Sequence, residues 1–182
     1  SGWLFGCAYR LAGAVGGITP KLVRPGTDEE AEGTKADRVR KIMRRVNPED
    51  TYRDFIEQNV VHLSLAGESY VEKARNRLKE TNELWTWRAV DVSPVADTTG
   101  RRRVASYVVR SGIGRAEYEI AAEEMIAIRV YSPSNPLRGQ SAVAPIWNDL
   151  LGDRDAARYN RNLIKRGMRT GGILQPKDGD LS

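Results

Sequence analysis

The chain has almost none of the side chains that most often bind metals or form catalytic pairs. Its 182 residues include one histidine, His62, and one cysteine, Cys7. A lone cysteine excludes a disulfide within these residues and suits a reducing compartment. One histidine without a cysteine pair excludes the usual zinc sites, which need several nitrogen or sulfur ligands. We therefore expect no metal and no catalytic group of these types.

Two further absences concern membranes and nucleotides. No apolar run approaches the ~20 residues of a membrane span, and the apolar residues 3–18 are interrupted by glycines and lack a basic head, unlike a signal peptide. The sequence contains no G-x-x-x-x-G-K-[S/T] loop, and the glycines of residues 13–17 follow a predicted helix, whereas a dinucleotide loop follows a strand. We expect no membrane partner and no cofactor.

The overall composition is that of a soluble globular protein. Hydrophobic residues make up 40% of the chain and charged residues 29%, which is typical of such domains, and this length corresponds to about one domain. The 29 Lys and Arg residues exceed the 24 Asp and Glu residues, which gives a net charge of +5. This mild excess permits contact with nucleic acid but does not imply it.

Hydrophobic periodicity predicts helices at the start of the chain. Apolar residues recur at three- and four-residue steps from Trp3 to Val15, and Gly16-Gly17 ends that helix. A third helix begins at Thr51, because Asp54 forms a relative of the capping box, and ends at Gly67. Between them we expect a strand over 20–24, a loop over 25–36 and a helix that Asp37 caps and Asn47-Pro48 ends.

The middle of the chain is rich in short β segments, and its end is helical. Turn residues separate β-rich stretches, and a long helix over 141–166 is ended by Gly167. The predicted fold is α+β, with N-terminal helices packed on a small mixed or antiparallel sheet and a long C-terminal helix. The predicted strands cover residues 68–75, 84–90, 103–110, 116–120 and 125–131.

Two segments are candidates for function on their residue types. Four basic residues of the last predicted helix follow i, i+4, i+7 and i+11 spacing, which puts them on one face that fits either a phosphate backbone or solvent. The segment "LRGQSAVAPI" has a flexible Gly139 and a serine suited to capping, so it is either an anion site or the start of a helix. The basic stripe consists of Arg154, Arg158, Arg161 and Lys165.

The order of these pieces resembles the N-terminal half of the portal proteins of tailed bacteriophages. Four short motifs carry the resemblance: Gly67–Tyr70 (GESY), Ile126–Arg129 (IAIR), Gly139–Ser141 (GQS) and Gly171–Leu174 (GGIL). Each motif is weak alone, and their order and spacing over nearly the whole chain give the match its weight. One departure is Ala142, where many relatives have proline; here the proline is Pro145, so the helix is expected to start near Ala144.

The resemblance implies a structural protein without catalytic activity. Portals are rings, usually of twelve subunits, at one capsid vertex, and a separate terminase motor pumps double-stranded DNA through them. Partners are then further copies of the chain, the terminase, capsid and head-tail adaptor proteins, and DNA bound without sequence preference. The implied location is the portal vertex of the virion, and the bacterial host cytoplasm during assembly.

The resemblance also implies a division of the chain into parts. Residues 1–140 correspond to a wing-like α+β domain, residues 141–167 to a stem-like helix, and residues 168–182 to the start of a clip-like segment. Family members continue further, so we expect this sequence to be a portion of a longer subunit. Gly139, Ser141 and Pro145 then form a structural joint, in which Gly139 bends the chain and Ser141 caps the helix.

Two other function classes stay open on the sequence alone. A small hydrolase-like enzyme would use His62 as its base and place it in a cleft beside a carboxylate or hydroxyl group. A free-standing DNA-binding module would gather its basic residues on one exposed face. In this sequence the basic residues are spread over 38–45, 101–103 and 154–165.

Overall fold

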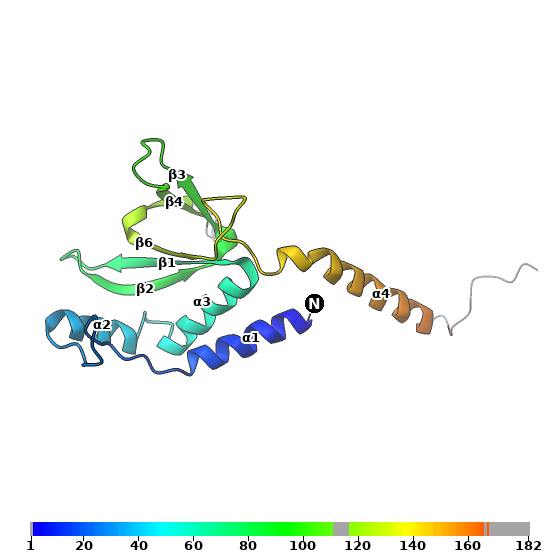
Figure 1. Cartoon of the computed structure of the whole chain (residues 1–182), viewed down its shortest axis with the longest axis horizontal. Helices are drawn as coiled ribbons and strands as arrows, with labels where there is room; N and C mark the ends of the chain where they lie inside the picture. Colours follow the sequence, from blue (N-terminus) through cyan, green and yellow to red (C-terminus); the bar gives the residue numbers. More distant parts are fainter. Residues whose placement is uncertain (1, 111–116, 166, 168–182) are drawn as a thin grey trace, which may run out of the picture. The chain divides into compact units, whose positions relative to one another are not determined.

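The computed structural model describes residues 2–110, 117–165 and 167 (Figure 1). The chain divides into two units, Gly2–Pro145 and Ile146–Ser182. The first unit contains helices α1 (Gly2–Gly16), α2 (Thr34–Arg44) and α3 (Tyr52–Ala66), followed by the β strands. The predicted α+β fold class is confirmed.

The first helices form where the sequence predicts them. α1 packs against α3 through a stripe of small residues, of which Ala8, Ala12 and Gly16 are buried. α3 begins with a complete capping box, since the Thr51 hydroxyl accepts from the Asp54 N–H and the Asp54 carboxylate accepts from the Thr51 N–H. It ends at Gly67, whose backbone is left-handed with φ of 74°, a conformation that costs glycine little.

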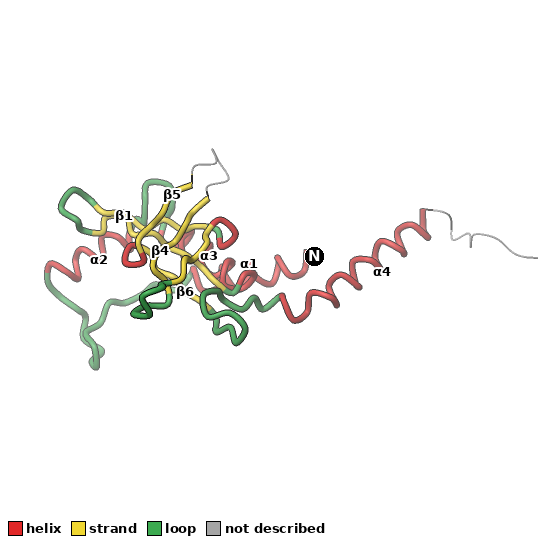
Figure 2. Tube along the Cα trace, turned by 90° about the horizontal axis from the view of Figure 1, so that it is seen from above, coloured by secondary structure: helices red, strands yellow, loops and turns green. Residues whose placement is uncertain are grey.

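The strands form two separate three-stranded antiparallel sheets. The first sheet has the order β2–β1–β6, with Tyr70 of β1 opposite Trp87 of β2 and Ala127 of β6. The second has the order β3–β4–β5, and its strands β4 and β5 are labelled in Figure 2. The strand bounds are β1 (Glu68–Arg75), β2 (Thr81–Trp87), β3 (Val92–Ala96), β4 (Val104–Arg110), β5 (Glu117–Ala121) and β6 (Met125–Arg129).

The main core lies between the two sheets. Its central contact is an edge-to-face pair of Tyr70 from β1 and Tyr107 from β4, with ring centroids 5.6 Å apart. Such a pair adds about 0.5–1.5 kcal/mol to the burial of the two rings. Aliphatic side chains from both sheets surround it, namely Val92, Val104, Val109, Ile120 and Met125. The core therefore fixes the position of β1, and with it the residues that follow α3.

Several local predictions are wrong. Residues 20–24 contain only a single bridge, Val23 to Glu30, because no neighbouring strand continues the pairing. α2 begins at Thr34 after Gly33, so Asp37 lies inside its first turn and does not cap it. The strand β3 was missed because it contains Pro94, which an edge strand tolerates.

Among its described residues, the second unit contains one long helix, α4 (Trp147–Lys165). It starts later than the predicted residue 141, because residues Ala144–Ile146, including Pro145, form a short 3-10 turn before it. Past its end, Gly167 has a left-handed backbone and donates its N–H to the Ile164 carbonyl at 3.0 Å. None of the α4 residues is buried. The predicted clip-like segment and the Gly171–Leu174 motif lie outside the described residues.

Candidate functional site

Two glycines from distant motifs meet backbone to backbone where α3 ends. Gly67 follows α3, and Gly139 belongs to the segment that leads out of β6. A Cβ atom at Gly67 would overlap the Gln140 carbonyl group, and one at Gly139 would overlap the Gly67 carbonyl group. The Gly67 carbonyl also accepts from the Val130 N–H at 2.8 Å. Both positions therefore require glycine for the segments to pack this closely.

A buried carboxylate beside these glycines holds the contact together. Glu68 is 2% exposed, and its Oε2 accepts from the Gly139 N–H at 2.7 Å and from the Tyr70 hydroxyl at 3.2 Å. Its Oε1 lies 2.5 Å from the Arg138 guanidinium. Burial and, secondarily, the Glu68 charge raise the pKa of Tyr70, so this hydroxyl stays a donor. We call Gly67, Glu68, Arg138, Gly139 and Ser141 the clasp.

Arg138 extends the clasp to the second sheet. Its guanidinium donates to the carbonyl of Val92, at the start of β3, at 2.7 Å and to the carbonyl of Ala89 at 3.2 Å. One side chain thus satisfies a buried acid from the first sheet and two backbone acceptors beside the second. The segment after β6 is tied to both sheets as a result.

Ser141 fastens the segment to α3 but does not cap α4. Its hydroxyl donates to the Leu65 carbonyl in the last turn of α3 at 2.5 Å and accepts from the Val143 N–H at 3.1 Å. Since α4 begins at Trp147, the predicted capping role of Ser141 is wrong. The Gly139 N–H is already bonded to Glu68 and is not available to a phosphate. A joint role for Gly139, Ser141 and Pro145 stays a prediction.

The sequence motifs contained the clasp but gave no reason to select its charged members. Glu68 lies inside the GESY motif and Arg138 directly precedes the GQS motif, yet neither was a candidate site residue. The usable signal is an acid at the start of a strand, followed by three uncharged residues, together with an arginine directly before a glycine that the packing requires. Their 70-residue separation hides the pairing, which only the packed sheets reveal.

His62 lies in a groove with acidic residues, but its buried ring nitrogen makes no hydrogen bond to them. It lines a groove of about 290 Å³ between α1 and α3, together with Asp54 and Glu57. Its Nδ1 is buried and has no hydrogen-bond partner among the described residues, so no hydrogen bond to this nitrogen orients the ring. Burial and the charge of Arg88 lower the pKa of His62. These features fit a packing residue better than a base.

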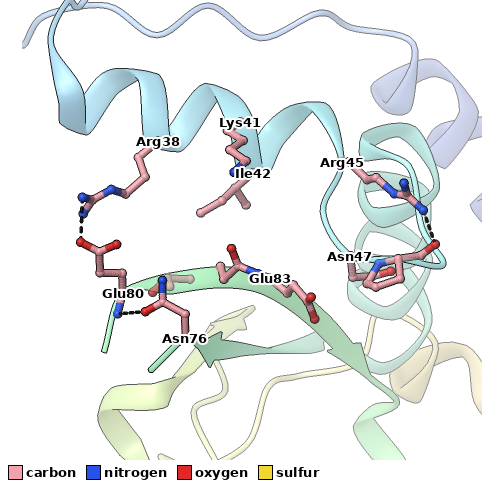
Figure 3. A pocket seen from close by; sticks show the side chains of 11 residues that line it. Arg38, Lys41, Ile42, Arg45, Asn47, Asn76, Glu80 and Glu83 are labelled. Atoms are coloured by element: carbon pink, nitrogen blue, oxygen red, sulfur yellow. Dashed lines mark hydrogen bonds and ion pairs between the residues drawn. The ribbon is translucent and has the colours of Figure 1, made fainter. Parts of the chain in front are cut away.

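The groove between α2 and β2 is polar, with basic side chains on one side and acidic side chains on the other (Figure 3). It measures about 520 Å³, with Arg38, Lys41 and Arg45 on the helix side and Glu80 and Glu83 on the strand side. Arg38 pairs with Glu80 at 2.7 Å. Among the described residues there is no cluster of three or more potential metal ligands and no helix long and apolar enough to cross a membrane.

The predicted basic stripe lies on α4 and is exposed along its whole length. All four side chains, Arg154, Arg158, Arg161 and Lys165, are exposed. Arg154 lies 3.5 Å from Asp155 of the same helix, and both side chains are more than 60% exposed. Such exposed pairs contribute about 0–1 kcal/mol each. Which surface the stripe faces in an assembly stays a prediction.

Comparison with known proteins identifies the family. The model of the family described as "Phage portal protein" matches residues 3–182. The chain belongs to the phage portal protein family. The predicted resemblance is thereby confirmed, and the match includes both the clasp and α4. None of the proteins with curated descriptions matches the chain.

Solved structures similar to this portal-family chain come from gene transfer agent particles. A chain of the neck of an empty particle, computed with C6 symmetry, has a TM-score of 0.74 at 18% identity over 98% of this chain. Chains of the native virion and of the native neck, computed with C12 symmetry, have TM-scores of 0.71 and 0.69 at 16% identity over 95% of this chain. These likenesses show the shared fold. This chain spans 43–48% of the length of those chains.

Proposed function

We propose that the chain is part of a ring-forming portal subunit at one vertex of a phage or phage-like capsid. The ring is the channel through which double-stranded DNA is packaged and ejected, and it connects the head to the tail. The family match over residues 3–182 carries this proposal. The similarity to chains of symmetric particle necks supports it.

In this proposal the parts of the chain have different places in the ring. Residues 1–140 form the wing, residues 141–167 belong to the stem, and residues 168–182 lead toward the clip. The clasp supports this division, because it fastens the segment 138–141 to α3 and to both sheets just before the chain enters α4. A fixed exit from the wing gives every subunit of a ring the same geometry.

The proposed subunit performs no catalysis of its own. Its partners are further copies of the chain in the ring, the terminase motor, the capsid and head-tail adaptor proteins, and double-stranded DNA held without sequence preference. It resides in the virion and, during assembly, in the host cytoplasm. The buried Nδ1 of His62, which has no hydrogen-bond partner among the described residues, supports a non-enzymatic role.

The test is assembly of the full-length subunit that contains this chain. Light scattering and negative-stain microscopy are expected to reveal one large, discrete species with rotational symmetry and a central channel. A full-length protein that stays monomeric or dimeric over a wide concentration range refutes the proposal. Packaging assays with His62→Ala in an assembled ring test the non-catalytic role, and normal DNA uptake is expected.

A further inference from the structure

The surface of α4 carries two short charged rows with the same spacing. Asp149 and Asp153 are four residues apart, and so are Arg154 and Arg158. Residues four apart lie on the same side of a helix, so each row forms one small charged patch. Like charges at this spacing destabilise an isolated helix. The acidic row has no basic residue three or four positions away on its own helix, so it is more favourable when a partner of opposite charge covers it.

The two rows cannot neutralise each other within one helix. Each arginine follows an aspartate by five residues, from Asp149 to Arg154 and from Asp153 to Arg158. Five residues turn about 140° around the helix axis and advance about 7.5 Å along it. The rows therefore point in different directions. Among the described residues, the only ion pair formed by α4 joins Arg154 to the neighbouring Asp155.

This angle matches the geometry of a closed ring. Each subunit of a cyclic ring contacts its two neighbours through two different patches. The directions to those neighbours differ by the interior angle of the ring, which is about 150° for twelve copies. Two complementary patches about 140° apart thus suit successive helices around a channel. The axial offset of five residues is similar to the reach of an extended arginine side chain.

We propose that Arg154 and Arg158 of one α4 pair with Asp149 and Asp153 of α4 in the next copy of the chain. The inference rests on the proposed ring and assigns one of its subunit contacts. Lack of buried residues on α4 supports it, as does Trp147, which is 54% exposed. Most of the stability of a helix in a protein comes from tertiary packing of its apolar face, and none of the 19 residues of α4 is buried. A neighbouring copy supplies both the packing and the opposite charge.

The remaining basic residues of the stripe provide an internal control. Five residues before Arg161 stands Ala156, and five residues before Lys165 stands Asn160. Neither position offers a carboxylate at the offset that serves Arg154 and Arg158. Arg161 and Lys165 therefore take no part in the proposed contact, although they belong to the same exposed stripe.

Complementary charge reversal in the full-length subunit tests the pairing. The acidic variant Arg154→Glu/Arg158→Glu and the basic variant Asp149→Lys/Asp153→Lys each bring like charges together at every interface. We expect each variant alone to lose the ring under conditions in which the wild type assembles. An equimolar mixture is expected to regain rings of alternating subunits, which native mass spectrometry detects as equal numbers of both variants. The control Arg161→Glu/Lys165→Glu is expected to assemble like the wild type.

The outcomes separate this contact from the ring itself. If the wild type forms no ring, the proposed function fails and the inference falls with it. If the wild type assembles but either variant alone also assembles, or if the mixture of two folded variants stays unassembled, the pairing is wrong. Circular dichroism checks folding, because lysine at 149 opposes the dipole of the first turn of α4.

Neutral variants keep the test independent of that folding effect. Arg154→Gln/Arg158→Gln and Asp149→Asn/Asp153→Asn are each expected to lower the salt concentration at which rings dissociate. The combination of all four changes is expected to lower it no further than either pair alone, since both pairs remove the same contact. Fully additive effects would overturn the pairing.

Discussion

Replacement of Gly67 by alanine tests whether the clasp depends on close backbone packing. Gly67 and Gly100 have nearly the same left-handed φ, 74° and 73°. A Cβ at Gly100 meets no atom within 4 Å, whereas one at Gly67 overlaps the Gln140 carbonyl group. Gly100→Ala is thus a matched control, because both changes carry the same backbone cost of about 1 kcal/mol. Only Gly67→Ala also displaces the segment 139–141.

The excess cost follows from the hydrogen bonds that this displacement breaks. The bond from the Gly139 N–H to the Glu68 carboxylate contributes about 2 kcal/mol, because one partner is charged, and the bond from Ser141 to Leu65 about 1 kcal/mol. The total for Gly67→Ala is therefore about 4 kcal/mol. With an m-value of about 2 kcal/mol/M, the urea midpoint falls by about 2 M, against about 0.5 M for Gly100→Ala.

Urea unfolding of the chain followed by circular dichroism measures both midpoints. Equal shifts for the two variants would refute the reasoning, because the overlap with Gln140 would then carry no cost. Gly139→Ala provides a second check. It has no left-handed backbone but has the same kind of overlap, with the Gly67 carbonyl. We expect its shift to lie between those of the other two variants.

Three further predictions concern single side chains. Arg138→Met is expected to cost about 3 kcal/mol in urea unfolding, because Glu68 stays buried without its counter-ion, and Glu68→Gln added to it should recover part of that loss. Thr51→Ala should cost about 1 kcal/mol in the same assay through the lost cap of α3. The folded-state pKa of His62 is lowered, so the unfolded chain binds the proton more readily, and stability should fall as pH decreases below about 6.5. His62→Gln should weaken this dependence, and an unchanged pH profile of the unfolding free energy would contradict the assignment.

Local signals in the sequence predicted the elements whose ends are set locally. The capping box of Thr51 and Asp54 and the left-handed Gly67 place both ends of α3 within a few residues of the chain itself. β1 follows directly, because its eight residues begin where that helix stops. By contrast, β3 contains a proline that is acceptable only because the strand lies at a sheet edge, and edge position is a tertiary property.

Only part of the clasp could be predicted from the sequence, because its charged members are paired by tertiary contacts. Gly139 and Ser141 stand out because glycine and serine have distinctive backbone chemistry. In the sequence, Glu68 and Arg138 look like ordinary surface charges. Only the folded structure places the Arg138 guanidinium 2.5 Å from the Glu68 carboxylate. The capping role of Ser141 failed because Leu65, its actual acceptor, lies 76 residues away along the chain.

α4 differs from the strands of the first unit, because it leaves all its side chains at least partly exposed. Within Gly2–Pro145 the strands of both sheets bury a shared core. α4 buries none of its residues and leaves Trp147, Tyr159 and Ile164 more than half exposed. Apolar side chains on a helix that also carries separate acidic and basic rows are costly in water and useful at an interface. In the proposed ring a neighbouring copy covers these side chains, and the charge-reversal mixture is the measurement that tests this contact.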